Sequence, residues 1–153
     1  MNGPSRSGAD AHYRALEGLY ESAPINRQYL SRLTIIEEGR SIIEFEVTPE
    51  HFHAAGAAHG TIYFKMLDDA AFYAANSLVT DMFLLTTAFN LWLTKPLKVG
   101  PVRAEGRWIS GHRRVLVAEA RLIDASGDEA ARGTGTFMRS RIALSGLPGY
   151  RHE

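Results

Sequence analysis

The sequence predicts an α+β fold in which a curved antiparallel sheet of about six strands wraps one long central helix, with a short helix at the N-terminus. The first indication is residues 59–78, where apolar side chains occupy nearly every face of the predicted helix, unlike a helix on a solvated surface. The second is the set of short connections after residue 80, which allow antiparallel pairing and leave no room for parallel crossovers. We therefore expect the sheet to cover the helix.

The N-terminal part of the chain is predicted to be a tail followed by a short helix. Residues 1–9 are small and polar, so we expect a disordered N-terminus, followed by a single domain over 10–153. Asp10 can cap a helix over about 11–22, and Pro24 follows the end of this helix.

Six segments have the composition or alternation of strands. Residues 30–38 and 41–48 form the first predicted pair, with Gly39 and Arg40 at the turn between them. The long helix follows, after a loop rich in His, Ala and Gly. Four further strands are separated by Pro and Gly breaks, and they span about 83–94, 101–110, 114–124 and 129–141.

Composition excludes several classes of function. The 153-residue chain has 17 basic and 17 acidic side chains, so its charge gives no reason to expect nucleic acid or an anionic membrane as a partner. It has no cysteine, which excludes disulfides, thiolate metal sites and cysteine nucleophiles. Because the N-terminus lacks the apolar core of a signal peptide and no membrane-length apolar run follows, we expect a cytoplasmic protein.

Two adjacent carboxylates lie on the predicted central helix. Lys65 precedes Asp69 by four residues, so an ordinary ion pair accounts for Asp69. Asp68 borders apolar residues such as Phe64, and a partly desolvated carboxylate with a raised pKa is suited to act as a general base or nucleophile. In the alternative interpretation both aspartates belong to a solvated or paired polar stripe, which consists of Thr61, Lys65, Asp68, Asp69 and Asn76.

The start of this helix is a second candidate site. The first amides of a helix have no internal acceptor and lie at the positive end of the helix dipole, so the Gly60 amide could hold a developing oxyanion. Gly56 and Gly60 would also let a ligand carbonyl approach the backbone. In the alternative interpretation these glycines only form the turn.

Three histidines, His51, His53 and His59, lie in the loop before the helix. Their spacing matches no standard zinc pattern and no cysteine assists them, so we expect hydrogen-bonding or capping groups rather than metal ligands. The sequence also lacks a glycine-rich nucleotide loop. We expect no metal and no other cofactor.

The loop and the helix together carry a motif. Its residues, in order, are His53-x-x-Gly56-x-x-His59-Gly60-Thr61, with Asp68 nine positions after the second His. This motif resembles that of the hotdog-fold acyl-CoA thioesterases, in the branch similar to phenylacetate-degradation (PaaI-like) thioesterases, where Asn-x-x-Gly-x-x-His-Gly-Gly precedes an Asp. The segment from Thr86 to Pro96 also looks like the next strand of that family, and the resemblance extends over about 30–141.

The resemblance implies a role for each residue of the motif. Asp68 would activate water as a general base or attack the thioester as a nucleophile, while the amide of Gly60 would polarise the thioester carbonyl. His59 would shape the turn, and Thr86 or Thr87 would hydrogen-bond the aspartate or the water.

This chain departs from the family pattern at two positions. His53 stands where the family commonly has Asn, and it is a further candidate catalytic residue. Thr61 replaces the second Gly of the usual pair, which would narrow the approach to the oxyanion-binding amide.

Candidate substrate-binding residues surround these positions. CoA carries phosphates that basic side chains at strand ends and turns could contact, and aromatic side chains could line an acyl or aryl pocket. The candidates are Thr61, Phe64, Thr87, Lys95, Arg113 and Arg114. In the alternative interpretation the basic residues are ordinary surface charge and the aromatic residues fill the core.

One helix cannot bring the two halves of this site together. Gly60 and Asp68 are eight residues apart, which is about 12 Å along a helix. A base and an oxyanion donor must both lie about 3 Å from one reacting centre. Two antiparallel helices across a two-fold axis would bring Asp68 of one subunit to Gly60 of the other, so we expect a homodimer, or a dimer of dimers that is a homotetramer.

The sequence therefore predicts an acyl-CoA thioesterase, a thioester hydrolase that converts an acyl- or aryl-CoA to the free acid and CoA. One alternative is a non-catalytic acyl-CoA-binding protein of the same fold, which the changes at His53 and Thr61 keep open. Another is an acyl-thioester hydratase or dehydratase, although the Pro/Gly-rich motif usual in that class is absent from the helix region. These residues do not predict which acyl chain is used.

Overall fold

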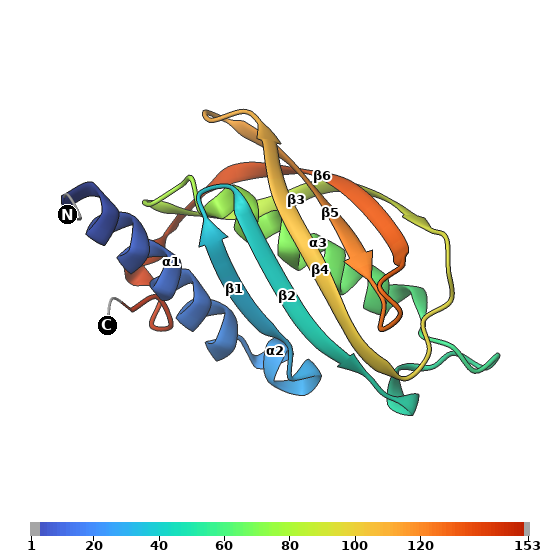
Figure 1. The fold of residues 1–153 in the computed structure, drawn as a ribbon. Helices are drawn as coiled ribbons and strands as arrows, with labels where there is room; N and C mark the ends of the chain where they lie inside the picture. Colours follow the sequence, from blue (N-terminus) through green and yellow to red (C-terminus); the bar gives the residue numbers. More distant parts are fainter. Residues whose placement is uncertain (1–3, 152–153) are drawn as a thin grey trace.

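A six-stranded antiparallel sheet curves around one long helix in the computed structural model, which describes residues 4–151 (Figure 1). The predicted fold class is therefore confirmed. None of the helices within the described residues is long and apolar enough to span a membrane. The elements in chain order are α1 (Pro4–Ser22), α2 (Pro24–Tyr29), β1 (Arg32–Glu37), β2 (Arg40–Val47), α3 (Gly60–Asn76), β3 (Met82–Leu93), β4 (Gly100–Ser110), β5 (Val115–Ile123) and β6 (Glu129–Ala143), with short 3-10 helices at Pro49–His51 and Leu144–Gly146.

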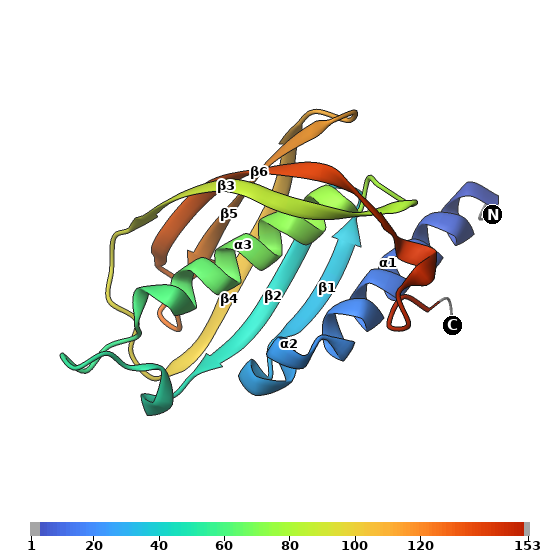
Figure 2. The same ribbon diagram turned by 180° about the vertical axis from the view of Figure 1, so that it is seen from behind.

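The sheet has the strand order β1-β2-β4-β5-β6-β3, and each neighbouring pair is antiparallel. Helix α3 runs across the concave face of this sheet (Figure 2). A side chain at Gly106 of β4 would collide with the carbonyl of Ala70, so the glycine lets the helix and sheet backbones approach closely. Ser41 Oγ of β2 donates to the same carbonyl at 2.5 Å. The Ala70 carbonyl of α3 therefore lies directly against the backbone of β4 and the Ser41 side chain of β2.

Helix α1 closes the β1 edge of the sheet. Arg14 Nη2 donates to the backbone carbonyl of Ile35, and Glu17 Oε2 accepts from the backbone amide of the same residue, both at 2.8 Å. Arg14 and Glu17 also pair with each other at 2.9 Å. Side chains of α1 therefore satisfy both backbone groups of a residue in an edge strand.

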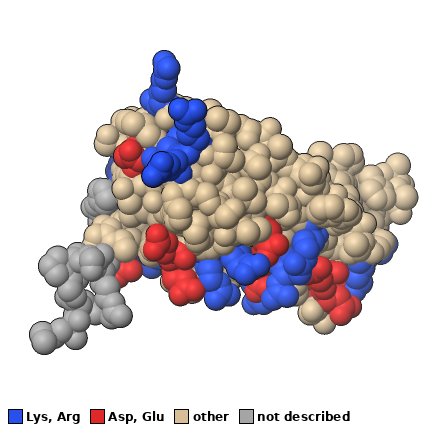
Figure 3. All heavy atoms as spheres, turned by 90° about the horizontal axis from the view of Figure 1, so that it is seen from above, with Lys and Arg blue, Asp and Glu red and all other residues tan. Residues whose placement is uncertain are grey.

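Strand β3 forms the opposite edge and is paired on one side, with β6. Most of its 12 residues are exposed, and Leu85, Trp92 and Leu93 keep 46%, 57% and 47% of their accessible surface. Seen from above, the molecule presents a broad uncharged surface with charged side chains gathered towards its margins (Figure 3). A long edge strand with exposed apolar side chains is the kind of surface that pairs with another chain.

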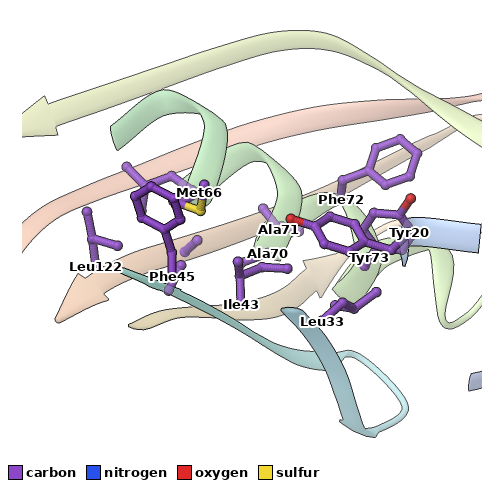
Figure 4. Packing of buried hydrophobic residues seen from close by; sticks show 14 of the residues in the cluster. Tyr20, Leu33, Ile43, Phe45, Met66, Ala70, Ala71, Phe72, Tyr73 and Leu122 are labelled. Carbon is purple, nitrogen blue, oxygen red and sulfur yellow. The ribbon is translucent and has the colours of Figure 1, made fainter. Parts of the chain in front are cut away.

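The hydrophobic core fills the space between α3 and the sheet (Figure 4). Met66 of α3 lies near Phe45 of β2 and Leu122 of β5, whereas Tyr73 contacts Tyr20 of α1, and all five side chains are buried. Burying apolar surface on most faces of α3 is what its sequence predicts, because a helix of this composition needs cover on several sides.

The end of α3 corrects one detail of the predicted polar stripe. Asn76 was expected in that stripe, but its side chain is fully buried. Its amide Nδ2 donates to the carbonyls of Val79 and Met82, both at 3.1 Å, and its Oδ1 accepts from the amide of Leu84 at 2.9 Å. Asn76 therefore fixes the turn from α3 into β3, because an amide side chain can both donate and accept.

The N-terminal region extends further into helix than predicted. Helix α1 begins at Pro4 rather than near residue 11, so residues 4–9, which were expected to be disordered, are helical. Residues 1–3 of the predicted tail lie outside the described residues. Pro24 opens α2, which was not predicted, because proline suits the first turn of a helix as well as the position after one.

Candidate active site

Asp68 lies midway along α3, on the side that faces β3. The hydroxyl of Thr86 on β3 donates to Asp68 Oδ1 at 2.9 Å. Burial raises the pKa of Asp68 to about 6, with the charge of Asp69 acting in the same direction and Thr86 and Lys65 acting against it. This raised pKa agrees with the first of the two interpretations of Asp68, because a carboxyl group with such a pKa can exchange protons near neutral pH.

The start of α3 leaves one amide without an acceptor. His59 is the N-cap: its Nδ1 accepts from the amide of Thr61 at 3.1 Å, and its carbonyl accepts from the amide of Ile62 at 2.9 Å. Within residues 4–151 the amide of Gly60 has no such partner. A Cβ at Gly60 would meet only Leu93, at an ordinary contact distance of 3.5 Å, so a small side chain would fit at this position. The free amide lies at the positive end of the helix dipole, where an oxyanion would be stabilised.

The loop histidines bind backbone amides, as predicted. His53 Nδ1 accepts from the amide of Ala55, and His51 Nδ1 accepts from the amide of Thr48, both at 3.0 Å. Gly56 completes the loop with a φ of +84°, which L side chains rarely adopt. In the described part of the chain, no group of three or more His, Cys, Asp or Glu residues is placed to hold a metal ion.

The two candidate threonines of β3 have different partners. Thr86 turns towards α3 and Asp68, whereas Thr87 Oγ1 bonds the carbonyl and the hydroxyl of Thr136 on β6, at 3.1 and 2.9 Å. The register of β3 and β6 shifts between Thr86 and Ala88, and this bulge separates the two hydroxyls. The structure therefore brings Thr86, and not Thr87, to the carboxylate.

The other candidates on α3 lie on the exposed side of the helix. The hydroxyl of Thr61 is 3.0 Å from His59 Nδ1, so it belongs to the cap of α3. Phe64 is partly exposed and makes an edge-to-face contact with Phe89 of β3, with ring centroids 5.6 Å apart. These two aromatic rings give the β3 side of α3 an apolar surface between Gly60 and Asp68.

The basic candidates do not gather at one place. Lys95, in the loop after β3, pairs with Asp124 at 2.6 Å and with Asp128 at 2.8 Å. Arg113 and Arg114 are exposed in the hairpin between β4 and β5, which projects at the opposite end of the sheet from the loop that carries Lys95 (Figure 1). A single phosphate group therefore cannot contact Lys95 and these arginines within one chain.

Sequence analysis missed the side chains that surround Asp69. Lys65 pairs with Asp69, as predicted, but the hydroxyl of Tyr20 also donates to Asp69 Oδ2 at 3.0 Å. Asn26 Oδ1 accepts from Lys65 Nζ at 2.5 Å across 39 residues of sequence. Burial raises the pKa of Asp69, and Lys65 and Tyr20 oppose that effect. No local pattern marks these partners, because they come from α1 and α2 and meet α3 only in the folded chain.

Comparison with known proteins supplies the family. A model described as the thioesterase superfamily matches residues 55–131. A Saccharolobus solfataricus protein named as an unconfirmed esterase is 26% identical over 132 residues, which are 84% of this chain and 94% of that protein.

Solved structures share the fold at low identity. The Escherichia coli PaaI protein, from the phenylacetic acid degradation operon, has a TM-score of 0.81 at 17% identity, over 88% of this chain and 97% of that one. A Streptococcus mutans protein bound to acetyl-CoA has a TM-score of 0.66 at 22% identity, over 72% of this chain and 88% of that one. At this identity the likeness concerns the fold.

Proposed function

We propose that this chain, which belongs to the thioesterase superfamily, hydrolyses the thioester bond of an acyl- or aryl-CoA. The observation that carries the proposal is the presence of two chemically complementary groups on α3. One is the half-buried carboxylate of Asp68, which accepts a hydrogen bond from Thr86, and the other is the amide of Gly60, which has no hydrogen-bond acceptor within residues 4–151. A base and an oxyanion donor are the two groups that hydrolysis of an acyl derivative needs.

The proposal that CoA is the thiol carrier is supported by solved structures of similar fold. One protein of similar fold is bound to acetyl-CoA, and the exposed Phe64 ring together with the partly buried Phe89 ring offers an apolar surface for the acyl or aryl group. Lys95 is already neutralised by two carboxylates, so we do not assign it to a CoA phosphate. Arg113 and Arg114 remain candidates for that contact.

The proposed reaction begins when the Asp68 carboxylate takes a proton from water. The hydroxide adds to the thioester carbonyl carbon, and the negative charge on the carbonyl oxygen is held by the Gly60 amide. The tetrahedral intermediate then breaks its C–S bond, and the CoA thiolate takes the proton from Asp68. Alternatively, the Asp68 carboxylate itself attacks the carbonyl carbon and the C–S bond breaks, which releases the CoA thiolate and leaves an anhydride that water then hydrolyses. Oxygen from labelled water enters Asp68 only in the second route.

The site requires two copies of the chain. Gly60 and Asp68 lie about 12 Å apart along one helix, so they cannot serve one thioester within a subunit. The open β3 edge is the surface through which we expect two copies to pair, with their α3 helices antiparallel. Each site would then combine Asp68 of one subunit with Gly60 of the partner subunit.

The first test is thiol release from short, long and aryl acyl-CoAs by the wild-type protein and by Asp68→Ala. We expect release from at least one class of acyl-CoA, and its loss in the variant. Release that is equal in both proteins would remove Asp68 from the mechanism. Tight acyl-CoA binding by calorimetry without any thiol release would instead identify a binding protein.

A further inference from the structure

The ammonium group of Lys65 lies among polar and aromatic groups from three helices. Its Nζ donates to Asn26 Oδ1 of α2 at 2.5 Å and pairs with Asp69 Oδ2 one turn along α3. It also lies over the rings of Tyr20 and Tyr29, 5.3 and 5.4 Å from their centroids. The Lys65 side chain keeps only 12% of its accessible surface, so these groups rather than water hold it.

The partners of Lys65 are themselves held in place. Tyr20 donates to Asp69 Oδ2 at 3.0 Å, and its hydroxyl lies 2.6 Å from Ser31 Oγ. Asn26 Nδ2 donates to the backbone carbonyl of Tyr20 at 2.8 Å. The N-terminal helices therefore fix the positions of the groups that surround Lys65.

Two carboxylates on α3 lie within reach of this ammonium group. Asp68 and Asp69 are three and four residues after Lys65, and both spacings allow an ion pair on a helix. Lys65 pairs with Asp69, whereas among residues 4–151 the hydrogen bond to the Asp68 carboxylate comes from Thr86.

We propose that Asp69, Asn26 and Tyr20 are positioning residues that hold the Lys65 ammonium away from Asp68 and so leave an oxygen of that carboxylate free to take a proton from water. This inference rests on the proposed function, in which Asp68 is the base. An ammonium group directly on Asp68 would stabilise its charged form and occupy that oxygen, which would weaken the base.

The titratable and charged groups near Asp68 lie on α3 and α1. Lys65, Asp69 and Tyr73 lie on α3 itself, and Tyr20 of α1 faces Asp69. From β3 the contact is the neutral hydroxyl of Thr86. Lys65 is therefore the cation whose placement controls the carboxylate in this part of the chain.

The test compares the pH dependence of kcat in three variants. In Asp69→Asn the like charge of Asp69 is lost and the freed ammonium can turn to Asp68, so we expect kcat to fall and its acid limb to move down by about one pH unit, further than the lost charge alone would move it. Lys65→Met removes the cation and should move the limb to higher pH. The double variant should return the limb towards its wild-type position. Lys65→Met alone leaves the Asp69 carboxylate without its cation, which is destabilising and could prevent folding. The double variant removes both charges, so the test remains available in that case.

A second readout does not depend on turnover. The titration of the carboxyl carbon of Asp68, followed by NMR in labelled protein, should shift in the same directions as the acid limb. Asp81→Asn is the matched control, since it makes the same chemical change in an exposed pair with Arg139 and should leave both readouts unchanged.

The outcomes separate the inference from the function on which it rests. If the shifts of the two single variants simply add up in the double variant, the inference is overturned, because the shift in Asp69→Asn then comes only from the lost charge of Asp69. A shifted titration combined with full turnover by Asp68→Ala would overturn the proposed function and still support the placement of Lys65.

Discussion

The two edges of the sheet end in opposite ways. At β1, side chains of α1 bond both backbone groups of Ile35 and cover a strand of six residues. At β3, a strand of 12 residues carries exposed apolar side chains and lies beside an uncharged surface. The chain therefore closes one edge by itself and leaves the other open, which supports our proposal that a second copy pairs there.

The open edge is also where the candidate site lies. Asp68 contacts Thr86, and Phe64 contacts Phe89. The space beside Gly60 is bounded by Leu93, near the end of the same strand. Each half of the proposed site therefore borders β3, so pairing along this strand and completing the site are the same event in our account.

Blocking the open edge should have the largest effect. Ala88 is exposed near the middle of β3, where a residue lies close to its own copy in a two-fold antiparallel pair. Ala88→Glu would bring like charges together, so we expect a monomer and loss of turnover. Light scattering and thiol release measure the two effects. Thr34→Glu makes a comparable change on β1 and should leave both unchanged; a fully active Ala88→Glu monomer would refute the account.

Removing the free amide should have the next largest effect. Gly60→Pro deletes the N–H at the first position of α3, where proline is tolerated, and His59 before it is already extended. We expect kcat to fall by about 10²- to 10³-fold, the usual cost of losing one oxyanion donor. Gly60→Ala keeps the amide and meets only Leu93, so it should stay close to wild type. Equal activity in both variants would argue against the oxyanion role.

The pH profile should reflect the environment of Asp68. Its pKa is raised from 3.8 to about 6, and a base works only when it is deprotonated, so kcat should fall as the pH drops through about 6. Thr86→Val removes a bond that favours the charged form, and the acid limb should move up by about one unit, or ~1.4 kcal/mol. The measurement is thiol release as a function of pH. If the acid limb of Thr86→Val does not move, Thr86 does not tune the pKa of the catalytic base.

The closed edge should affect stability alone. Glu17→Ala leaves the amide of Ile35 without its acceptor, so we expect the free energy of unfolding to fall by about 1–3 kcal/mol. Urea unfolding measures this loss. The molecular mass of the assembly and kcat should not change. Glu21→Ala, at an exposed position of the same helix, should be close to neutral. Dissociation of the assembly by Glu17→Ala would mean that the two edges are not independent.

The sequence predicted those parts of the molecule that local periodicity encodes. The alternation of the strands and the apolar faces of residues 59–78 were sufficient to predict the sheet and the central helix, and they made Asp68 a candidate for a partly desolvated carboxylate beside the alternative of a solvated stripe. The glycine and histidine spacing before the helix predicted where the capped turn lies, because capping is set by residues two or three positions apart.

Contacts between distant segments were not predictable in this way. A polar residue in a helical pattern is usually taken to face solvent. The prediction therefore placed Asn76 in the polar stripe, and this was wrong because its side chain is buried. A bulge that turns Thr87 towards β6 has no clear signal in composition. The pairing of Lys95 with Asp124 and the contact of Asn26 with Lys65 depend on segments that meet only after folding.

The central claim is that each site joins Asp68 of one subunit to Gly60 of the partner subunit, and mixing two inactive variants tests it most directly. Asp68→Ala and Gly60→Pro chains are each expected to be inactive as homodimers. In their heterodimer one site carries both changes and the other carries neither, so we predict turnover of about half that of the wild-type dimer. A purified heterodimer with no recovered activity would contradict the claim, because a site contained within one chain would be damaged in both subunits.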